Sequence, residues 1–208
     1  DLTEGTTDPE MIHKRAEVRF IRALNYYHML DMFGKVPFTV TVSGTNPEQI
    51  SRESLYEWLI DEVEGGHSGK TYMNAKGGVI SYYKVTGDAD HGLIDDLYDK
   101  GETTIYRATK PAANMLLARL YLNAEVYTGT AEWGKAEEYA RKVIATCPEL
   151  HKPFAQIFMG DNEVVAPEEM IFIAACDGAY LRSYAGSQYT INSCRNQKMN
   201  DCGSSDNN

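Results

Sequence analysis

The sequence predicts a mostly α-helical protein, in which TPR-like helical hairpins stack as a solenoid-type scaffold and an irregular, loop-rich portion with little β-structure follows. Apolar residues recur every three or four positions in four segments between residues 8 and 147, as on one face of an α-helix. Residues 148–208 lack this periodicity and end in small polar residues. We therefore expect one domain over residues 1–208, with TPR-like helices over 8–147 and the irregular portion over 148–208.

The first predicted helix begins after Asp8 and ends at Gly34. An aspartate can accept hydrogen bonds from free amides of the first turn, and the proline that follows it tolerates the first helical position. Glycine readily adopts the left-handed conformation that ends many helices, and Val36-Pro37 then requires an extended chain. The apolar face of this helix consists of Ile12, Ala16, Phe20, Ala23, Leu24, Tyr27 and Leu30.

Three further helices are predicted over residues 51–64, 109–128 and 130–147, each followed by glycine or proline. Thr109 is expected to cap the second of these with its side chain. In the last helix we expect five residues to face the core: Ala136, Tyr139, Ala140, Val143 and Ile144.

The segment from Thr109 to Cys147 has nearly the length of a TPR hairpin, whose repeat is ~34 residues. Small alanine side chains let neighbouring helices approach closely. A single hairpin cannot bury its own apolar face, so such units stack on one another. The first two helices are expected to form a second unit with a longer connection.

Residues 65–106 match no regular pattern, apart from a short helical turn expected between Leu93 and Tyr98. This stretch contains an acidic cluster of Asp88, Asp90, Asp95, Asp96 and Asp99. Calcium prefers several carboxylate oxygens on a flexible loop, but Leu93 stands where an EF-hand has its glycine. The cluster is therefore either a cation site or a solvated loop, and we assign no metal ligand to it.

The chain of 208 residues has a formal net charge of −10. This charge disfavours nucleic acid and anionic membrane surfaces as partners, because both attract clustered Lys and Arg. The four cysteines form no CxxC pair, which disfavours a zinc site. Cys194 and Cys202 are close enough in sequence to be bridged, and free thiols are the alternative.

No catalytic constellation is evident in the sequence. The five histidines are scattered, and the GxSxG context of a nucleophilic serine is absent. A glycosidase requires two carboxylates at a set separation across the scissile bond, and no carboxylate pair is fixed by its spacing here. We therefore expect neither enzymatic activity nor a cofactor.

Five blocks of sequence, in order, resemble the SusD/RagB family. The first is E-x-R-F-x-R-A, then Y-Y and G-x-V-P, over residues 17–37. The others are R-A-T-K-x-A-A with L-A-R-L-Y-L-N-A over 107–124, W-x-K-A-x-x-Y-A over 133–140, F-x-G-D-N over 158–162, and E-E-M-I-F over 168–172. Pro111 stands where the family pattern has a small residue, and nothing is carried over to residues 65–106.

The resemblance implies a surface-exposed lipoprotein of a Gram-negative outer membrane. Such a protein binds extracellular oligo- or polysaccharide and delivers it to a SusC-like TonB-dependent transporter, without catalysis or a cofactor. Its membrane contact is expected only through a lipid anchor that this chain does not contain. A Gly- and Trp-rich segment expected after residue 192 is absent, so we expect the chain to be an incomplete piece of a longer protein.

The irregular portion contains residue types that suit a glycan-binding platform. Aromatic rings can stack on the apolar face of a sugar, while amide and guanidinium groups bind its hydroxyls. The alternative is that these tyrosines pack against the helical half of the protein. The candidate ligand-binding residues are Tyr180, Arg182, Tyr184, Gln188, Tyr189 and Asn192.

Two other functions are compatible with the sequence. The first is a TPR-type scaffold for protein partners without glycan binding, and the second is an α-helical carbohydrate enzyme. Whichever function holds, Arg22 and Arg119 are expected to be structural, because each lies beside an apolar stripe where it can bind carbonyls or carboxylates of the next unit.

Overall fold

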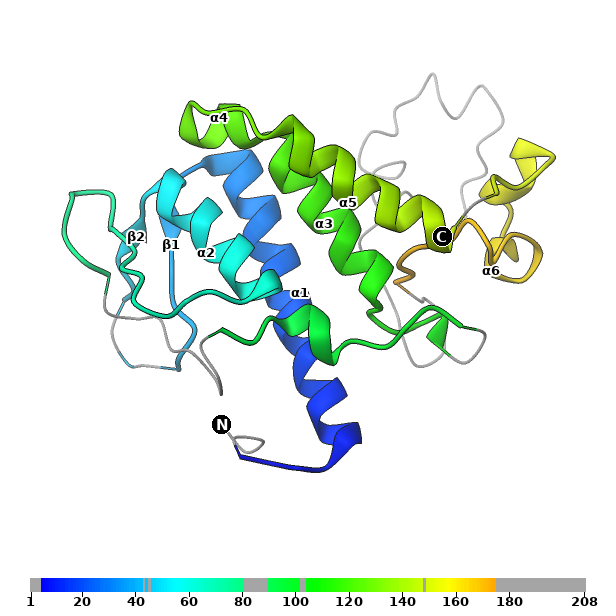
Figure 1. Ribbon diagram of the computed structural model, residues 1–208, viewed down its shortest axis with the longest axis horizontal. Coiled ribbons are helices and arrows are strands. Elements are labelled where there is room, and N and C mark those ends of the chain that lie inside the picture. The colour runs from blue at the N-terminus through cyan, green and yellow to red at the C-terminus, as the bar shows by residue number, and fades with distance from the viewer. Residues whose placement is uncertain are drawn as a thin grey trace, which may run out of the picture. The chain divides into compact units, whose positions relative to one another are not determined.

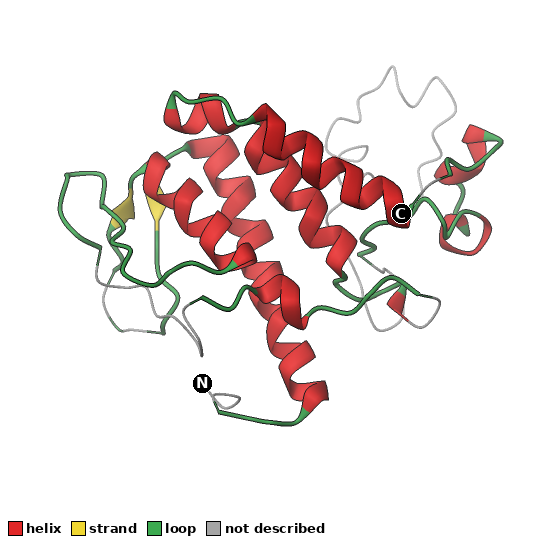
Figure 2. Cartoon of the chain, viewed as in Figure 1, coloured by secondary structure: helices red, strands yellow, loops and turns green. Residues whose placement is uncertain are grey.

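The fold is described from a computed structural model of the chain. It describes residues 5–42, 44, 46–80, 90–101, 104–147 and 149–174. Most of these residues are helical, as the sequence predicts (Figure 2). None of the helices in these ranges is long and apolar enough to cross a membrane.

Helix α1 spans Pro9–Phe33 and confirms the predicted helix at both ends. The Asp8 side chain accepts a hydrogen bond from the Glu10 amide at 3.1 Å. Gly34, with φ of 73°, ends the helix and donates its N–H to the Leu30 carbonyl. The buried face agrees with the predicted stripe and includes Ala16, Phe20, Ala23, Tyr27 and Leu30.

Helix α2 spans Arg52–Glu64 and is capped by the Ser51 side chain, which accepts from the Ser54 amide. Two short strands precede it: β1 (Val36–Pro37) pairs with β2 (Gln49–Ile50) in an antiparallel arrangement. These strands bring α2 back to pack against α1 (Figure 1).

The predicted helix over residues 109–128 is in fact two helices, α3 (Lys110–Leu122) and α4 (Ala124–Thr128). Asn123 separates them, and its side chain donates to the Arg119 carbonyl at 3.3 Å. Asparagine favours such local bonds to the backbone over a continuing helix, which explains the break. Thr109 occupies the N-cap position, but its side chain makes no capping hydrogen bond, contrary to the prediction.

Helix α5 spans Trp133–Thr146, three residues shorter at its start than predicted. It packs along α3 as a helical hairpin (Figure 1). Ala136 and Val143 are buried as predicted, but Ile144 is 61% exposed, so its predicted inward orientation is wrong. The α1–α2 and α3–α5 pairs account for the hairpin prediction, whereas their stacking as a solenoid stays a prediction.

The core lies between α1, α2 and α3. Its largest buried side chain is Trp58 of α2, whose ring meets those of Tyr26 and Phe38 edge to face at 5.7 and 4.9 Å. On the other side, Phe20 of α1 and Leu117 of α3 are almost fully buried. Side chains of this size each stabilise the fold by about 1.5–3 kcal/mol through burial.

The described part of residues 65–101 folds over α2 without long helices or strands. A 3-10 helix, η1 (Leu93–Asp96), forms where a short helical turn is predicted. The chain passes very close to α2 at Gly92, because a Cβ atom there would lie 2.3 Å from the Val63 carbonyl oxygen. Only glycine permits this approach.

Beyond α5, the described chain contains a 3-10 helix, η3 (Phe154–Phe158), and a short helix, α6 (Asn162–Val165). The short apolar run at residues 172–175 is compatible with a strand. In the described part of that stretch, residues 172–174, the chain has no regular secondary structure. An apolar residue stands at position 172 because the Phe172 ring packs against the Phe20 ring, at 5.4 Å between ring centroids.

Candidate functional site

All six predicted ligand-binding residues lie outside the described residues: Tyr180, Arg182, Tyr184, Gln188, Tyr189 and Asn192. Their role stays a prediction. Cys194, Cys202 and Asp88 also lie outside the described ranges. The structure does describe the segment that leads toward the predicted loop, and this segment lines a cavity.

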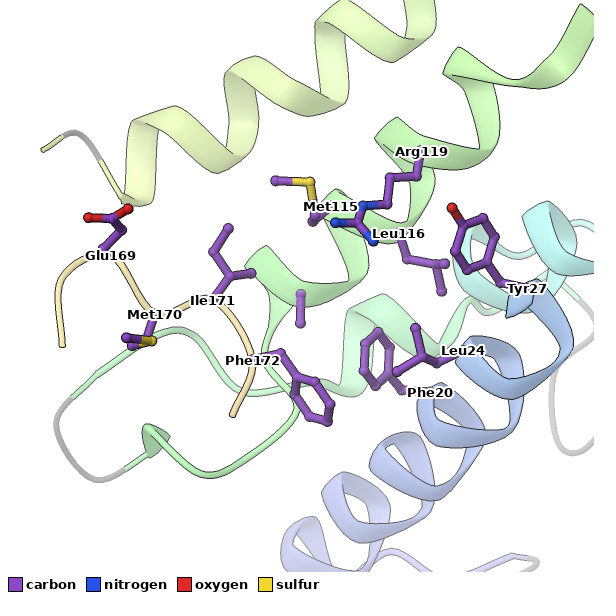
Figure 3. Close-up of a pocket in the computed structure, with 11 residues that line it drawn as sticks. Phe20, Leu24, Tyr27, Met115, Leu116, Arg119, Glu169, Met170, Ile171 and Phe172 are labelled. Carbon is purple, nitrogen blue, oxygen red and sulfur yellow. The ribbon is translucent and has the colours of Figure 1, made fainter. Parts of the chain in front are cut away.

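The cavity lies between α1, α3 and residues 169–172 (Figure 3). Its volume is about 320 Å³. Helix α1 contributes the side chains that the sequence identifies as one apolar stripe, and α3 contributes those of its neighbouring face. The lining residues are Phe20, Leu24, Tyr27, Ala112, Met115, Leu116, Arg119, Glu169, Met170, Ile171 and Phe172.

Two charged side chains interrupt the apolar lining. Arg119 is exposed, and among the residues that the structure describes its guanidinium has no hydrogen-bond or ion-pair partner. The predicted contact of Arg119 with a carbonyl or carboxylate is therefore not present here. Glu169 accepts a hydrogen bond from the His151 amide at 2.8 Å. The cavity can receive an apolar group and place a guanidinium beside it.

Apart from the cavity, a polar assembly joins α1 to α2 and centres on the buried carboxylate of Glu62. Arg19 binds both carboxylate oxygens, with Nε 3.0 Å from Oε1 and Nη2 3.2 Å from Oε2. Arg22 Nη2 lies 2.6 Å from Oε1, and His67 Nε2 lies 3.2 Å from Oε2. Arg22 is thus structural, as predicted, and its guanidinium also lies over the Trp58 ring at 5.7 Å.

The pKa of Glu62 reflects two opposing causes. Burial raises the pKa of this carboxyl, whereas hydrogen bonds from His67 and Arg19 and the charges of Arg19 and Arg22 lower it. The net result is a pKa of about 2, below the ordinary value of 4.5. Glu62 is therefore ionised at neutral pH and holds two arginines at the α1–α2 interface.

The same assembly continues through the chain that follows α2. His67 Nδ1 lies 2.5 Å from the Tyr72 hydroxyl, which donates to Asp61 Oδ2 at 2.8 Å. Lys70 Nζ donates to Asp61 Oδ1 at 2.5 Å. We refer to the four residues Glu62, His67, Tyr72 and Asp61 as the α2 polar chain. The sequence shows Glu62 beside the apolar stripe of α2, but nothing in its pattern identifies His67 as the partner.

Other residues of the resemblance blocks also bind across helices. Glu17 on α1 accepts from Arg107 Nε at 2.8 Å and from the Ala108 amide at 3.1 Å. Glu64 on α2 accepts from the hydroxyl groups of Tyr121 and Tyr139. Burial first, and then the nearby Glu64 carboxylate, raise the pKa of both tyrosines above the ordinary value of 10.0. These residues fix the positions of the helices relative to one another.

The acidic cluster contains no evident cation site in its described part. His91 Nε2 lies 2.9 Å from Asp96 Oδ1, and His91 Nδ1 lies 3.8 Å from Asp95 Oδ2. Within the described ranges, no group of three or more His, Cys, Asp or Glu side chains could hold a metal ion. His91 therefore lies against two carboxylates of the cluster, those of Asp95 and Asp96.

Comparison with known proteins identifies one similar sequence and structures with a similar fold. No protein-family model matches the chain. The starch-binding protein SusD of Bacteroides thetaiotaomicron is 36% identical over 193 residues, which is 92% of this chain and 30% of SusD. The chain therefore spans less than a third of that relative.

Two solved structures share the fold. A SusD-like protein from Bacteroides fragilis has a TM-score of 0.55 at 19% identity, covering 81% of this chain and 28% of that one. Surface glycan-binding protein A from Bacteroides uniformis has a TM-score of 0.52 at 23% identity, covering 76% of this chain and 30% of that one. The fold is therefore that of SusD-like helical proteins. The similarity to SusD extends over most of this chain and supports the SusD/RagB family, as the five sequence blocks predict.

Proposed function

We propose that the protein binds an extracellular oligo- or polysaccharide at the cell surface, without hydrolysing it. The observation that carries this proposal is the 36% identity to a starch-binding protein over 92% of this chain. The interhelical contacts of Arg19, Glu62 and Glu17 agree with a helical scaffold that supports a binding portion elsewhere in the protein.

The segment from residue 180 to residue 192, which the sequence predicts to be a loop, is the best candidate for the glycan contact. It combines aromatic side chains, which supply stacking area, with amide and guanidinium groups, which orient hydroxyls. The cavity beside Arg119 matches a glycan less well, because its Phe20 ring is only 2% exposed and its other walls are mostly aliphatic. We therefore retain Tyr184 and Tyr189 as the expected sugar-stacking residues.

Delivery of the glycan to a SusC-like TonB-dependent transporter in the outer membrane is the second part of the proposal. The family resemblance supports it, as does a set of exposed apolar side chains on α1 that could meet a partner. Val18, Met32 and Phe33 are 71, 66 and 68% exposed. A transporter encoded by an adjacent gene should co-purify with the lipid-anchored protein, and loss of co-purification on Met32→Glu with Phe33→Glu would place the contact on α1.

The exposed side chains of α1 also favour one alternative, a protein-interaction scaffold without glycan binding. Apolar side chains that stay exposed on a helix are often interaction sites. The scaffold predicts a protein partner and no affinity for any polysaccharide. The glycan-binding proposal predicts affinity for one class of glycan in the purified protein alone.

The experiment is affinity electrophoresis of the purified protein in gels containing plant, starch or host polysaccharides. The proposal predicts retardation by one class and no release of reducing ends on prolonged incubation. Release of reducing ends would show an enzyme, and normal mobility in every gel, with the fold verified by circular dichroism, would favour the scaffold.

A further inference from the structure

The α2 polar chain consists of three consecutive short contacts in a buried setting. They join Glu62 Oε2 to His67 Nε2 at 3.2 Å, His67 Nδ1 to the Tyr72 hydroxyl oxygen at 2.5 Å, and that oxygen to Asp61 Oδ2 at 2.8 Å. His67 is 4% exposed and Tyr72 is 0% exposed. At these separations each contact requires one hydrogen between its two heavy atoms.

The neutral groups supply one hydrogen too few. A neutral imidazole carries one ring hydrogen, the tyrosine hydroxyl carries one, and an ionised carboxylate carries none. Three contacts therefore have two hydrogens between them, and the third contact would set two lone pairs against each other inside the protein. A buried contact of that kind costs the desolvation of both groups without a hydrogen bond in return.

We propose that His67 carries the third hydrogen as an imidazolium ion and that this proton holds residues 65–80 against the C-terminal end of α2. With both ring nitrogens donating, His67 binds Glu62 and Tyr72, and Tyr72 donates to Asp61. Each of the three contacts then has one donor and one acceptor.

The charged groups around His67 come from three segments. Asp61 and Glu62 on α2 favour the imidazolium, whereas Arg19 and Arg22 on α1 oppose it. Arg19 and Arg22 both bind Glu62 directly, and Lys70 binds Asp61, so each of these charges already has a carboxylate partner. Contact polarity requires one extra proton in the chain of contacts, and the Lys70 ammonium on Asp61 Oδ1 favours its place on His67 over the Asp61 carboxylate.

The proton on His67 also affects how residues 65–80 are held at the start of α2. Residues 65–80 are also attached to the start of α2, because the Ser51 amide donates to the Met73 carbonyl and the Met73 amide donates to Ser54 Oγ, both at 2.9 Å. A buried contact without its hydrogen costs the desolvation of both groups. Residues 65–80 should therefore be held more weakly when the third hydrogen of the chain of contacts is missing.

The test is ¹⁵N NMR of the protein labelled at histidine ring nitrogens, with the His67 signal assigned by its absence in His67→Gln. At pH 7 the proposal predicts that both ring nitrogens of His67 carry hydrogens. The Asp61→Asn variant provides a matched comparison, because its amide can donate to the Tyr72 oxygen and so supplies the missing hydrogen covalently. In that variant His67 should carry one ring hydrogen.

Hydrogen exchange provides the second readout. In the wild type, the protection factor of the Lys70 amide, which donates to the His67 carbonyl, should fall about tenfold once His67 loses its proton. In Asp61→Asn the protection factor of the Lys70 amide should not change with pH. One hydrogen-free ring nitrogen in the wild type at pH 7 would overturn the proposal, even if Asp61→Asn failed to fold.

Discussion

The Glu62→Gln substitution tests the buried ion-pair assembly between α1 and α2. Glutamine preserves the shape of the side chain but removes the charge that faces Arg19, which is 6% exposed, and Arg22. Breaking a buried pair on one side leaves an uncompensated charge and costs about 3–5 kcal/mol. We expect the free energy of unfolding to fall by this amount.

The pKa of Glu62 gives an independent magnitude for the same interaction. Because the folded-state pKa of about 2 lies below the ordinary value of 4.5, the carboxylate contributes stability above pH 4.5 and loses it as the pH falls toward 2. A difference of about 2.5 pH units corresponds to about 3 kcal/mol.

The assay is equilibrium urea unfolding, followed by circular dichroism, at pH 7 and at pH 3. Glu137→Gln is the matched control, because its pair with Arg141 is mostly exposed and should contribute less than about 1 kcal/mol. The wild type should lose more stability than Glu62→Gln on acidification. If Glu62→Gln and Glu137→Gln had equal effects at pH 7, the assembly would not stabilise the interface as argued.

Three further substitutions test particular contacts. Arg22→Ala should lower the free energy of unfolding by about 2 kcal/mol, through loss of a charged hydrogen bond to Glu62, and an unchanged melting temperature would contradict this role. Phe20→Ala should cost about 3–5 kcal/mol by leaving a cavity beside Phe172, and urea unfolding that shows less than 1 kcal/mol would mean that the site is not packed as described. Gly92→Ala should prevent the close approach to α2, so unaltered near-UV circular dichroism would be inconsistent with the fold.

The main helices could be predicted because their ends and faces carry local signals. Asp8, Pro9 and Gly34 determine the ends of α1 by capping chemistry, which depends on nearby backbone alone. The buried stripe of α1 follows from the helical period. The break at Asn123 was missed because the apolar stripe continues through it, and Ile144 was misplaced because periodicity cannot tell which flank of a stripe meets a neighbour.

The polar contacts were less predictable than the helices. Arg22 was recognised as structural from its position beside the stripe, but Arg119, in a similar position, faces the cavity without a partner in the described part of the chain. His67 joins Glu62 only because the chain turns back at Gly65 and Gly66, whose φ values are 90° and 116°. Such a turn depends on tertiary contacts that no spacing rule contains.

The central claim is that a SusD-like scaffold presents a glycan site in the loop that follows it. Isothermal titration of maltooligosaccharides, and of any other glycan that retards the protein, tests it most directly with Tyr184→Ala/Tyr189→Ala beside the wild type. Tyr106→Ala is the control, since this tyrosine is 53% exposed and lies outside the predicted loop. The account predicts binding by the wild type and the control, and affinity at least tenfold weaker in the double variant with unchanged thermal stability. Equal affinity in all three would remove the loop from the site, and no binding by the wild type to any glycan would contradict the claim itself.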